Sequence, residues 1–391
     1  MGTIYLDNAS TTAVKKEVLD AMIPYFTDEY GNPSSTSSLG MSANRAIEKA
    51  REVIASTIKA NPDEIFFTSG GTESNNWALK GYCDFIFSLW GNDYMPVIYV
   101  SPMEHPSIYN TCKYLEDSIY GAYIIEFLLD ENKQIDVEKT FDMHSTFNII
   151  TPLISVMLGN NEIGTIQDIK SISDKFISKI VHTDAVQCYG QIPINVNDLG
   201  VDMLSASGHK LGAPKGIGFL YISKCVQDLI PSFIHGGHQQ RGYRAGTENV
   251  PYIVGLAKAA EIANNNLNWK IWHTSNLKNR FIEGLKDLNC IVNTPDYSLP
   301  GIVNVTFPKC EGEKIVFILD TYGICISAGS ACSSNTEDKS RTLLQLGYPK
   351  DIAYASVRFS FGENNTTQDV DDVLRILHQI IPRMQDSGRE I

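Results

Sequence analysis

A lysine stands at the end of an apolar, strand-like run and is followed by a glycine-rich turn. The run covers residues 201–206, the turn begins Ser207-Gly208-His209-Lys210, and small residues and glycines continue to residue 218. An amine that forms a Schiff base must be partly desolvated and held near a carbonyl carbon. The stretch suits Lys210 to that chemistry, although an ordinary exposed loop lysine would fit it as well.

Other polar side chains follow apolar runs in the same way. A glycine-rich segment, Ser69-Gly70-Gly71-Thr72-Glu73, follows residues 65–68; His105 follows residues 97–100; Asn161 follows residues 153–158; and Asp184 and Gln187 follow residues 180–183. Glycines before a helix let backbone N–H groups approach an anion. A plain helix cap is the alternative for the glycine-rich segment, which lacks the Gly-Lys-Ser/Thr of a nucleotide-binding loop.

Two of these side chains, Asp184 and His105, have both a chemical and a structural interpretation. Asp184 ends an apolar run, so its carboxylate needs a cation or several donors, and a protonated pyridine nitrogen would serve. A helix cap explains Asp184 nearly as well. His105 could stack on a cofactor ring or move a proton near neutral pH, or it could be a structural histidine. The amides of Asn161 and Gln187 suit a ring oxygen but mean little singly.

Two residues in the C-terminal third could also carry chemistry. Cys332 lies among small polar residues from Ala328 to Asp338, which predicts a mobile, solvated loop and makes its thiol a candidate nucleophile. Cys325 belongs to an apolar run and is predicted to be strand core. Arg358 stands in an apolar strand-like run, where a buried guanidinium needs a planar anion such as a carboxylate. A structural ion pair is the alternative for Arg358.

The elements that carry these residues alternate between short apolar runs and helix-like segments. This alternation predicts an α/β fold with a mostly parallel sheet. Ligands of such sheets bind beyond the carboxyl ends of the strands, where the polar clusters fall. The pattern further predicts helices at residues 15–25, 43–58, 251–288 and 366–381, a helix-end turn at 264–266, and strands at 300–308 and 357–361. We expect a large domain at 15–260 and a small domain formed by 1–14 and 261–391.

Composition describes an ordinary globular protein. The chain has 391 residues, of which 43% are hydrophobic and 20% charged, and a net charge of −13 argues against nucleic-acid binding. No apolar run approaches the ~18 residues of a membrane helix. The start lacks the features of a secretion signal, and the eight scattered cysteines form no Cys-x-x-Cys pair. We therefore expect a cytoplasmic protein with reduced thiols, no membrane contact and no intrinsic metal.

Taken in order, the motifs resemble the cysteine desulfurases, which are pyridoxal phosphate enzymes of the aspartate-aminotransferase fold (fold type I). The resemblance covers nearly the whole chain, from Tyr5 to about Ile381. Its motifs are Tyr5-Leu6-Asp7, Gly31-Asn32-Pro33-Ser34-Ser35, Thr68-Ser69-Gly70-Gly71-Thr72-Glu73-Ser74-Asn75-Asn76, Glu104-His105, Asn160-Asn161-Glu162-Ile163-Gly164, His182-Thr183-Asp184-Ala185-Val186-Gln187, Ser207-Gly208-His209-Lys210, Arg244-Ala245-Gly246-Thr247, Ser330-Ala331-Cys332 and Val357-Arg358-Phe359-Ser360. The ordered set is highly specific, and its Gly-Ser-Ala-Cys form looks like the subgroup with a long cysteine loop.

The resemblance implies a large domain with a seven-stranded type of sheet and a role for each residue. Lys210 holds the cofactor as a Schiff base, His105 stacks on its ring, Asp184 pairs with the ring nitrogen, and Gln187 pairs with the ring hydroxyl. Asn161 lies beside the ring and the substrate. The phosphate is held by Gly71, Thr72, Ser207 and His209, and by Thr247 of the other subunit of a homodimer. Arg358 clamps the carboxylate of L-cysteine.

The implied reaction converts L-cysteine to L-alanine. Lys210 takes the Cα proton, and Cys332 accepts the sulfur as a persulfide and passes it to an acceptor or iron–sulfur scaffold protein, where an iron–sulfur contact of Cys332 is transient. The acceptor's pathway stays open among cluster assembly, tRNA thiolation and DNA phosphorothioation. Selenocysteine lysis, transamination and an inactive cofactor-binding scaffold are the alternatives. Transamination would not need Cys332, whereas a cysteine protease would leave Lys210 unexplained.

Four positions depart from the family pattern. Ser37 stands where histidine is usual, the segment Gly236-Gly237-His238-Gln239-Gln240 differs at His238 and Gln240, and Ala245 replaces a serine. None of these residues has an assigned chemical role. They bear on loop structure, subunit contacts and the choice of partner.

Overall fold

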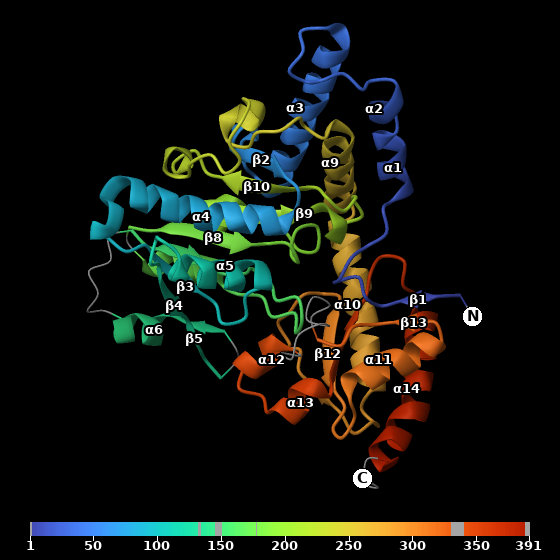
Figure 1. Ribbon diagram of the computed structural model, residues 1–391. Helices are drawn as coiled ribbons and strands as arrows, with labels where there is room; N and C mark the ends of the chain where they lie inside the picture. The colour runs from blue at the N-terminus through green and yellow to red at the C-terminus, as the bar shows by residue number, and fades with distance from the viewer. Residues whose placement is uncertain (1, 132–133, 145–150, 177, 330–339, 388–391) are drawn as a thin grey trace.

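The computed structural model describes residues 2–131, 134–144, 151–176, 178–329 and 340–387. Its centre is a seven-stranded sheet (Figure 1). The strands, in spatial order, are β2 (Ile65–Thr68), β10 (Gly218–Ile222), β9 (Met203–Ser207), β8 (Ile180–Asp184), β7 (Leu153–Ser155), β3 (Val97–Val100) and β4 (Tyr123–Glu126). The predicted runs at 65–68 and 97–100 are strands over those residues, whereas the run at 153–158 leaves the sheet after Ser155.

One strand of this sheet runs against the others. β10 is antiparallel to both of its neighbours, β2 and β9, and the other pairings within the described sheet are parallel. β2 therefore points the same way as β9, and six strands share one direction. Their carboxyl ends meet at one edge, as the α/β pattern predicts.

Helices cover both faces of the sheet and bury two apolar clusters. On one face α4 (Gly71–Trp90) and α5 (Pro106–Asp117) pack over a cluster that includes Trp77 and Leu220. On the other face α1 (Lys16–Met22), α3 (Ser38–Ile58) and α9 (Val250–Asn265) pack over a cluster that includes Ile47 and Phe219. Because Leu220 and Phe219 are neighbours on β10, the strand alternates its side chains between the two cores.

The C-terminal part has a sheet and an apolar core of its own. β11 (Ile291–Val292), β12 (Ile302–Thr306) and β14 (Ser356–Ser360) form an antiparallel sheet beside α10 (Leu267–Gly284), α11 (Gly312–Thr321) and α14 (Thr367–Ser387). Phe281 of α10 packs on Phe359 of β14, with ring centroids 4.5 Å apart. Thr366 caps α14 by accepting from the Asp369 N–H at 3.1 Å. The predicted domain boundaries near residues 15 and 260 stay a prediction.

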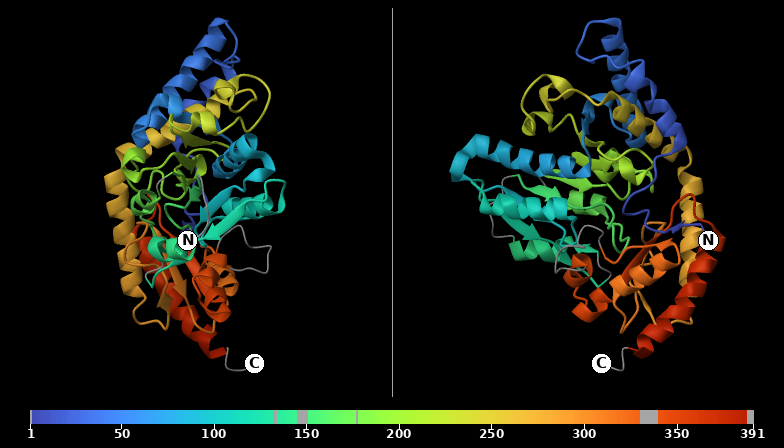
Figure 2. Two further views of the ribbon diagram at one scale, coloured as in Figure 1. Left: turned by 90° about the vertical axis from the view of Figure 1, so that its left-hand side faces the viewer. Right: turned by 45° about the vertical axis from the view of Figure 1, so that its right-hand side comes forward.

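The N-terminal segment lies between these two parts. β1 (Ile4–Tyr5) pairs in parallel with β13 (Ile324–Cys325), while α1, which follows closely in the chain, packs on α9 (Figures 1 and 2). Ile4 and Leu6 are buried in the C-terminal core. Residues 5–11 therefore pass close to both sheets, and this places them at the site described below.

The helix-like stretch 251–288 is two helices, not one. α9 and α10 meet at Asn266, which has φ −100° and ψ 4° and so breaks the helical path. The helix-end turn predicted at 264–266 is found at Asn266, whereas Asn264 and Asn265 are the last residues of α9. The predicted helix at 15–25 is likewise interrupted, because Pro24 begins a separate turn, α2 (Pro24–Thr27).

The remaining elements are short and connect the larger ones. They are β5 (Leu128–Leu129), β6 (Ile135–Asp136), α6 (Val137–His144), α7 (Ile169–Lys175), α8 (Val196–Leu199), α12 (Arg341–Gln345) and α13 (Lys350–Tyr354), with 3₁₀ turns at Pro62–Glu64, Gly91–Asp93, Gly208–Lys210, Gln227–Leu229 and Gln239–Gly242. In the described part of the chain, no helix combines the length and apolar character that crossing a bilayer would require.

Candidate active site

The carboxyl ends of the strands enclose a cavity of about 450 Å³. Ten of the residues singled out in the sequence line it: Gly71, Thr72, His105, Asn161, Asp184, Gln187, Ser207, His209, Lys210 and Arg358. A cavity of this size takes a small cofactor together with a small substrate. The cavity thus brings together the residues predicted from the strand ends.

Lys210 reaches into the cavity from the 3₁₀ turn after β9. The turn is compact because Gly208 donates its N–H to the Ile217 carbonyl at 2.9 Å, and a Cβ at Gly208 would meet the Ala213 and Ile217 side chains at 3.0 Å. Nζ of Lys210 donates to the carbonyl oxygens of Ala9 at 2.6 Å and Ser10 at 2.8 Å. The amine therefore lies against the N-terminal segment, partly removed from solvent.

Asp184 ends β8 and is buried, with 5% of its surface exposed. Its Oδ2 accepts from Nδ2 of Asn75 at 2.7 Å, and its Oδ1 accepts from the N–H of Val186 at 2.9 Å. Both donors are neutral, and no ion pair joins Asp184 to a cation among the described residues. A buried carboxylate of this kind favours a cationic ligand group in the cavity.

The start of α4 suits a ligand group of the opposite, negative charge. Gly70, with φ 151°, lets the chain turn sharply from β2 into the helix, whose first N–H groups at Gly71 and Thr72 have no helical acceptor. Ser207 and His209 complete this side of the cavity. Burial, aided by Lys210 and Lys215, lowers the pKa of His209 to about 4, so its ring is neutral at pH 7. The arrangement is suited to an anion such as a phosphate.

His105 caps the start of α5. Its Nδ1 accepts from the backbone N–H of Ser107 at 3.1 Å and lies 2.8 Å from the Ser107 hydroxyl. Burial lowers the pKa of His105, with Asp184 opposing that shift and Lys210 adding to it. The ring is therefore uncharged at neutral pH, which suits a flat group that stacks on an aromatic ligand.

The two amides make different contacts. Nε2 of Gln187 donates to the Ala9 carbonyl at 2.9 Å, so this side chain shares an acceptor with Lys210. The backbone carbonyl of Asn161 accepts from Nη1 of Arg358 at 2.7 Å. Asn161 thus connects the strand end of β7 to the guanidinium on β14.

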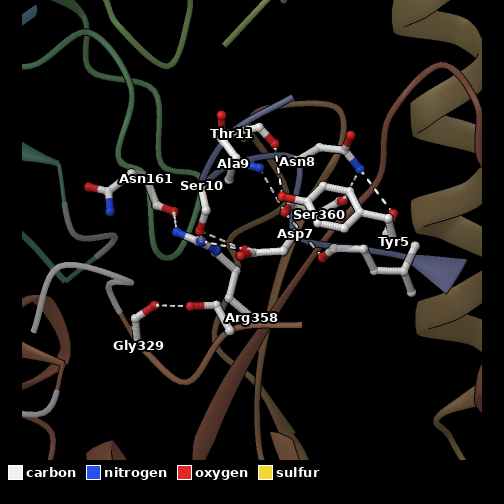
Figure 3. Close-up of polar contacts among 12 residues, drawn as sticks. Tyr5, Asp7, Asn8, Ala9, Ser10, Thr11, Asn161, Gly329, Arg358 and Ser360 are labelled. Carbon is white, nitrogen blue, oxygen red and sulfur yellow. Dashed lines mark hydrogen bonds and ion pairs between the residues drawn. The ribbon is translucent and has the colours of Figure 1, made fainter. Parts of the chain in front are cut away.

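Arg358 forms the ion pair that was the structural alternative in the sequence. Its Nη2 donates to Oδ1 of Asp7 at 2.8 Å and to the hydroxyl of Ser10 at 2.6 Å (Figure 3). Nε is buried and has no acceptor among the described residues. The arginine therefore combines a structural ion pair with a buried donor beside the cavity, and the two interpretations of Arg358 are compatible.

Sequence reasoning missed the contacts that complete the site. Asp7, Ala9 and Ser10 contact Lys210 and Arg358 from positions far away in the chain, and Asn75 holds Asp184 from inside α4. Asp7 and Asn75 belong to motifs that resemble the family, but the sequence assigns neither of them a role. Their charged or amide side chains within these motifs are the signal that could have identified them.

Two predicted residues are not part of the cavity as described. Thr247 is exposed and lies beside a smaller pocket with Ser69 and Arg244, so its own chain does not bring it to the cavity. Cys332 and its neighbours fall in residues 330–339, outside the described residues. The predictions for both stay predictions. The loop before Thr247 is connected to α4, because Arg244 pairs with Glu73 through two contacts of 2.9 and 3.2 Å.

The four departures have structural roles. Ser37 caps α3 by accepting from the Gly40 N–H at 3.2 Å, and His238 precedes the turn at Gln239–Gly242. Gln240 is buried with φ 44°; its Oε1 accepts from the Phe67 N–H at 2.9 Å. Ala245 is buried and donates its N–H to the Ile234 carbonyl at 2.9 Å.

The groups around the cavity fit pyridoxal phosphate. The start of α4 with Ser207 suits the phosphate, buried Asp184 suits a protonated ring nitrogen, and Lys210 is an amine for the aldehyde. The close approach of Gly71 to Val186 leaves no room for a side chain there, because a Cβ would come 2.5 Å from Cγ2 of Val186. Backbone N–H groups can therefore approach the ligand closely at this point.

Known proteins with the same architecture support this assignment. The family Aminotransferase class-V matches residues 4–373. The cysteine desulfurase IscS of Methanosarcina thermophila is 41% identical over 387 residues, covering 98% of this chain and 93% of that protein. A solved NifS-like protein has a TM-score of 0.88 at 36% identity, covering 97% and 99% of the two chains. The structure of SspA in complex with cysteine has a TM-score of 0.78 at 33% identity, covering 93% and 100%.

These similarities extend over nearly the full length of each protein, so they include every strand end that forms the cavity. They also agree with the mixed sheet and the groups suited to pyridoxal phosphate. The chain belongs to the cysteine desulfurase family of the class-V aminotransferases.

Proposed function

We propose that the chain is a pyridoxal phosphate-dependent cysteine desulfurase that converts L-cysteine to L-alanine and takes up the sulfur on Cys332. The observation that carries the proposal is the cavity itself, where the Lys210 amine shares one space with the buried Asp184 carboxylate and the Arg358 guanidinium. The relatives named cysteine desulfurase and the neighbour solved with cysteine support the same substrate.

Different residues of the chain bind the cofactor and the substrate. Asp184 and the start of α4 hold the two ends of the cofactor, and His105 offers a neutral ring to its face. Arg358, which lines the cavity with Asn161, binds the substrate carboxylate. When bound, pyridoxal phosphate supplies the electron sink that makes the Cα proton of an amino acid acidic.

Lys210 then acts as the base. Its Nζ, once free of the cofactor, takes the Cα proton and becomes an ammonium group. The carbonyls of Ala9 and Ser10, which already lie 2.6 and 2.8 Å from Nζ, accept hydrogen bonds from that charge. The same Nζ can return the proton when alanine is completed.

The sulfur step is a displacement at sulfur. The Cys332 thiolate attacks Sγ of the substrate, a sulfur–sulfur bond forms, and the carbon–sulfur bond breaks. The electron pair of the broken bond remains with the carbon fragment, which is protonated to give alanine. One L-cysteine and one thiol thus become one L-alanine and one persulfide, with no outside oxidant or reductant. An acceptor protein, such as an iron–sulfur scaffold, then removes the terminal sulfur.

The proposal includes a homodimer in the cytoplasm. Thr247 is exposed in its own chain, next to the Arg244 that contacts α4, and we assign it to the phosphate site of the second subunit. Iron–sulfur cluster assembly is the use of the sulfur that the IscS relatives suggest, and tRNA thiolation is a further use. A monomer that sediments as such and retains full activity would contradict the dimer.

The test compares Cys332→Ala with a matched thiol variant. Cys225 is exposed, as a surface control requires, and lies away from the cavity. We expect Cys225→Ala to release alanine and sulfide from L-cysteine at the wild-type rate, and Cys332→Ala to lose both while keeping the cofactor absorbance. A persulfide found by alkylation and mass spectrometry on the Cys332 peptide of the wild type would identify the acceptor.

Two results would contradict the proposal. If Cys332→Ala desulfurates as fast as the wild type, Cys332 is not the acceptor, and selenocysteine lysis or transamination becomes the better assignment. If the purified protein gains no absorbance band when pyridoxal phosphate is added, Lys210 does not hold the cofactor.

A further inference from the structure

Arg358 is held by a cluster of side chains from the N-terminal segment. The guanidinium is buried, with 1% of the side chain exposed, and Asp7 is its ion-pair partner. Figure 3 shows Asp7 and Ser10 on one side of the guanidinium and the Asn161 carbonyl on the other. The partners come from opposite ends of the chain, so the contact is made only in the folded protein.

The donors of Arg358 can be counted. Nη2 has two hydrogens, and it donates to Oδ1 of Asp7 at 2.8 Å and to the hydroxyl of Ser10 at 2.6 Å. The Ser10 hydroxyl in turn donates to Oδ1 of Asp7 at 2.8 Å, which closes a three-membered network. Nη1 donates to the Asn161 carbonyl. The second hydrogen of Nη1 and the hydrogen of Nε, which is buried and has no acceptor among the described residues, remain for a ligand.

Asp7 supports this arrangement from outside the cavity. Arg358, Ser10 and Asn161 line the cavity, and Asp7 does not. A substrate carboxylate in the cavity can therefore approach Arg358 without passing Asp7. The Asp7 charge neutralises the guanidinium when no substrate is present, and an unpaired buried guanidinium would be costly.

Asp7 is also fixed relative to the strand that carries Arg358. The backbone next to Asp7 follows β14, because Ser360 donates its N–H to the Leu6 carbonyl at 2.7 Å. On the other side of Asp7, Nδ2 of Asn8 donates to the Ser360 carbonyl at 2.8 Å. Asp7 thus lies in a segment anchored two residues away from Arg358, as a positioning group requires.

We propose that Asp7, with Ser10, is the positioning pair of the substrate-carboxylate site. The pair holds Nη2, so that the remaining donors of Arg358, which lines the cavity, can bind the carboxylate of an amino-acid substrate. This inference rests on the proposed role of Arg358 in binding L-cysteine. Asp7 touches neither substrate nor cofactor, so its effect is expected in binding of the carboxylate and not in the chemistry of the amine.

The experiment measures binding of two amines that differ by the carboxylate. L-alanine and ethylamine are titrated into the cofactor-loaded homogeneous protein, and their dissociation constants are read from the change in cofactor absorbance. Because the carboxylate contact depends on a correctly held guanidinium, Asp7→Ala should weaken L-alanine binding by at least about tenfold and change ethylamine binding by less than about twofold. Asp7→Asn keeps the shape of the side chain and should weaken L-alanine binding to a smaller extent.

The matched control is another aspartate–arginine pair. Asp371 binds Arg280 through two contacts of 2.7 Å, on α14 and α10 and away from the cavity. Asp371→Ala should leave the binding of both amines unchanged. If Asp7→Ala does not fold, the ratio of L-alanine to ethylamine binding in Asp7→Asn decides the question.

Two results would overturn the inference. Equal weakening of L-alanine and ethylamine in both Asp7 variants would assign Asp7 a general structural role. Tighter L-alanine binding in the variants would make Asp7 a competitor of the substrate. If either result is obtained and the wild-type protein releases alanine from L-cysteine, only the role of Asp7 is overturned. A wild type that does not desulfurate L-cysteine, yet binds L-alanine through Asp7, overturns the proposed reaction and supports the positioning pair.

Discussion

Asn75 donates a hydrogen bond of 2.7 Å from Nδ2 to Oδ2 of Asp184, and both side chains are buried. The same nitrogen also lies 2.8 Å from the hydroxyl of Ser107, the residue whose N–H donates to His105. One amide on α4 therefore connects the carboxylate at the end of β8 with the histidine that caps α5. From this position we expect Asn75 to influence how the cofactor is held.

Replacing Asn75 should weaken cofactor binding. Asn75→Ala removes one of the two hydrogen bonds that Asp184 accepts, and a bond to a charged group contributes about 1.5–3 kcal/mol. We expect the dissociation constant of pyridoxal phosphate to rise by roughly 10- to 100-fold, measured by absorbance titration of cofactor-free protein. Asn76→Ala is the control, because the neighbouring Asn76 is directed to the Thr72 carbonyl and not to Asp184. An equal loss in both variants would count against the role of Asn75.

Adding a methyl group at Gly71 should have a similar effect for a steric reason. The new Cβ would come 2.5 Å from Cγ2 of Val186, whose branched side chain has little rotational freedom. Because Val186 lies two residues after Asp184, Gly71→Ala should move both sides of the cavity and reduce cofactor affinity by about tenfold. The double variant Gly71→Ala/Val186→Ala returns the space and should recover most of the affinity. No recovery would mean that the glycine is needed for its backbone alone.

The stability of the protein should depend on pH through His182. This ring lies within β8, 2.9 Å from the hydroxyls of Ser155 and Ser205, and burial lowers its pKa to about 3. An unfolded histidine titrates near pH 6.5, so between about pH 6.5 and 3 the unfolded state binds more protons than the folded state. The His182 contribution is thus complete above pH 6.5 and falls as the pH decreases, by at most about 1.4 kcal/mol per pH unit.

Urea unfolding at several pH values tests this expectation. His182→Gln should be less stable than the wild type at pH 7.5, because it disturbs a buried hydrogen-bonded site. The difference between the two proteins should shrink as the pH is lowered from 6.5 to 5. Parallel stability curves would show that His182 does not titrate as its burial implies. The exposed His378→Gln serves as a control for the loss of a histidine.

The cavity could be predicted from the sequence because its residues follow directly from local patterns. Runs such as 65–68 and 97–100 are apolar and short, and each is followed by polar or glycine residues, so their carboxyl ends are visible in the sequence. The rule for parallel strands then places those ends together. Lys210 and Asp184 were found in this way without any contact between them being visible.

The contacts that hold those residues could not be predicted in the same way. Asp7 and Arg358 are 351 positions apart, and nothing in the periodicity of either segment indicates the other. Two backbone carbonyls accept hydrogen bonds from the Lys210 amine. Because every residue type has a backbone carbonyl, the residue types do not indicate this contact. Such features depend on tertiary packing.

Residues 5–11 pass between the two sheets, and this affects the order in which a chain can bind cofactor and substrate during its synthesis. Every residue assigned to the cofactor within one chain lies at or before Lys210, whereas Arg358 and the strand that anchors Asp7 are made near the end of translation. A nascent chain could thus assemble the groups for the cofactor while Asp7 still lacks its cation. On the proposed role of Arg358, recognition of the amino acid is then the last capability to appear, and a chain that stops before β14 would lack the guanidinium that binds the substrate carboxylate.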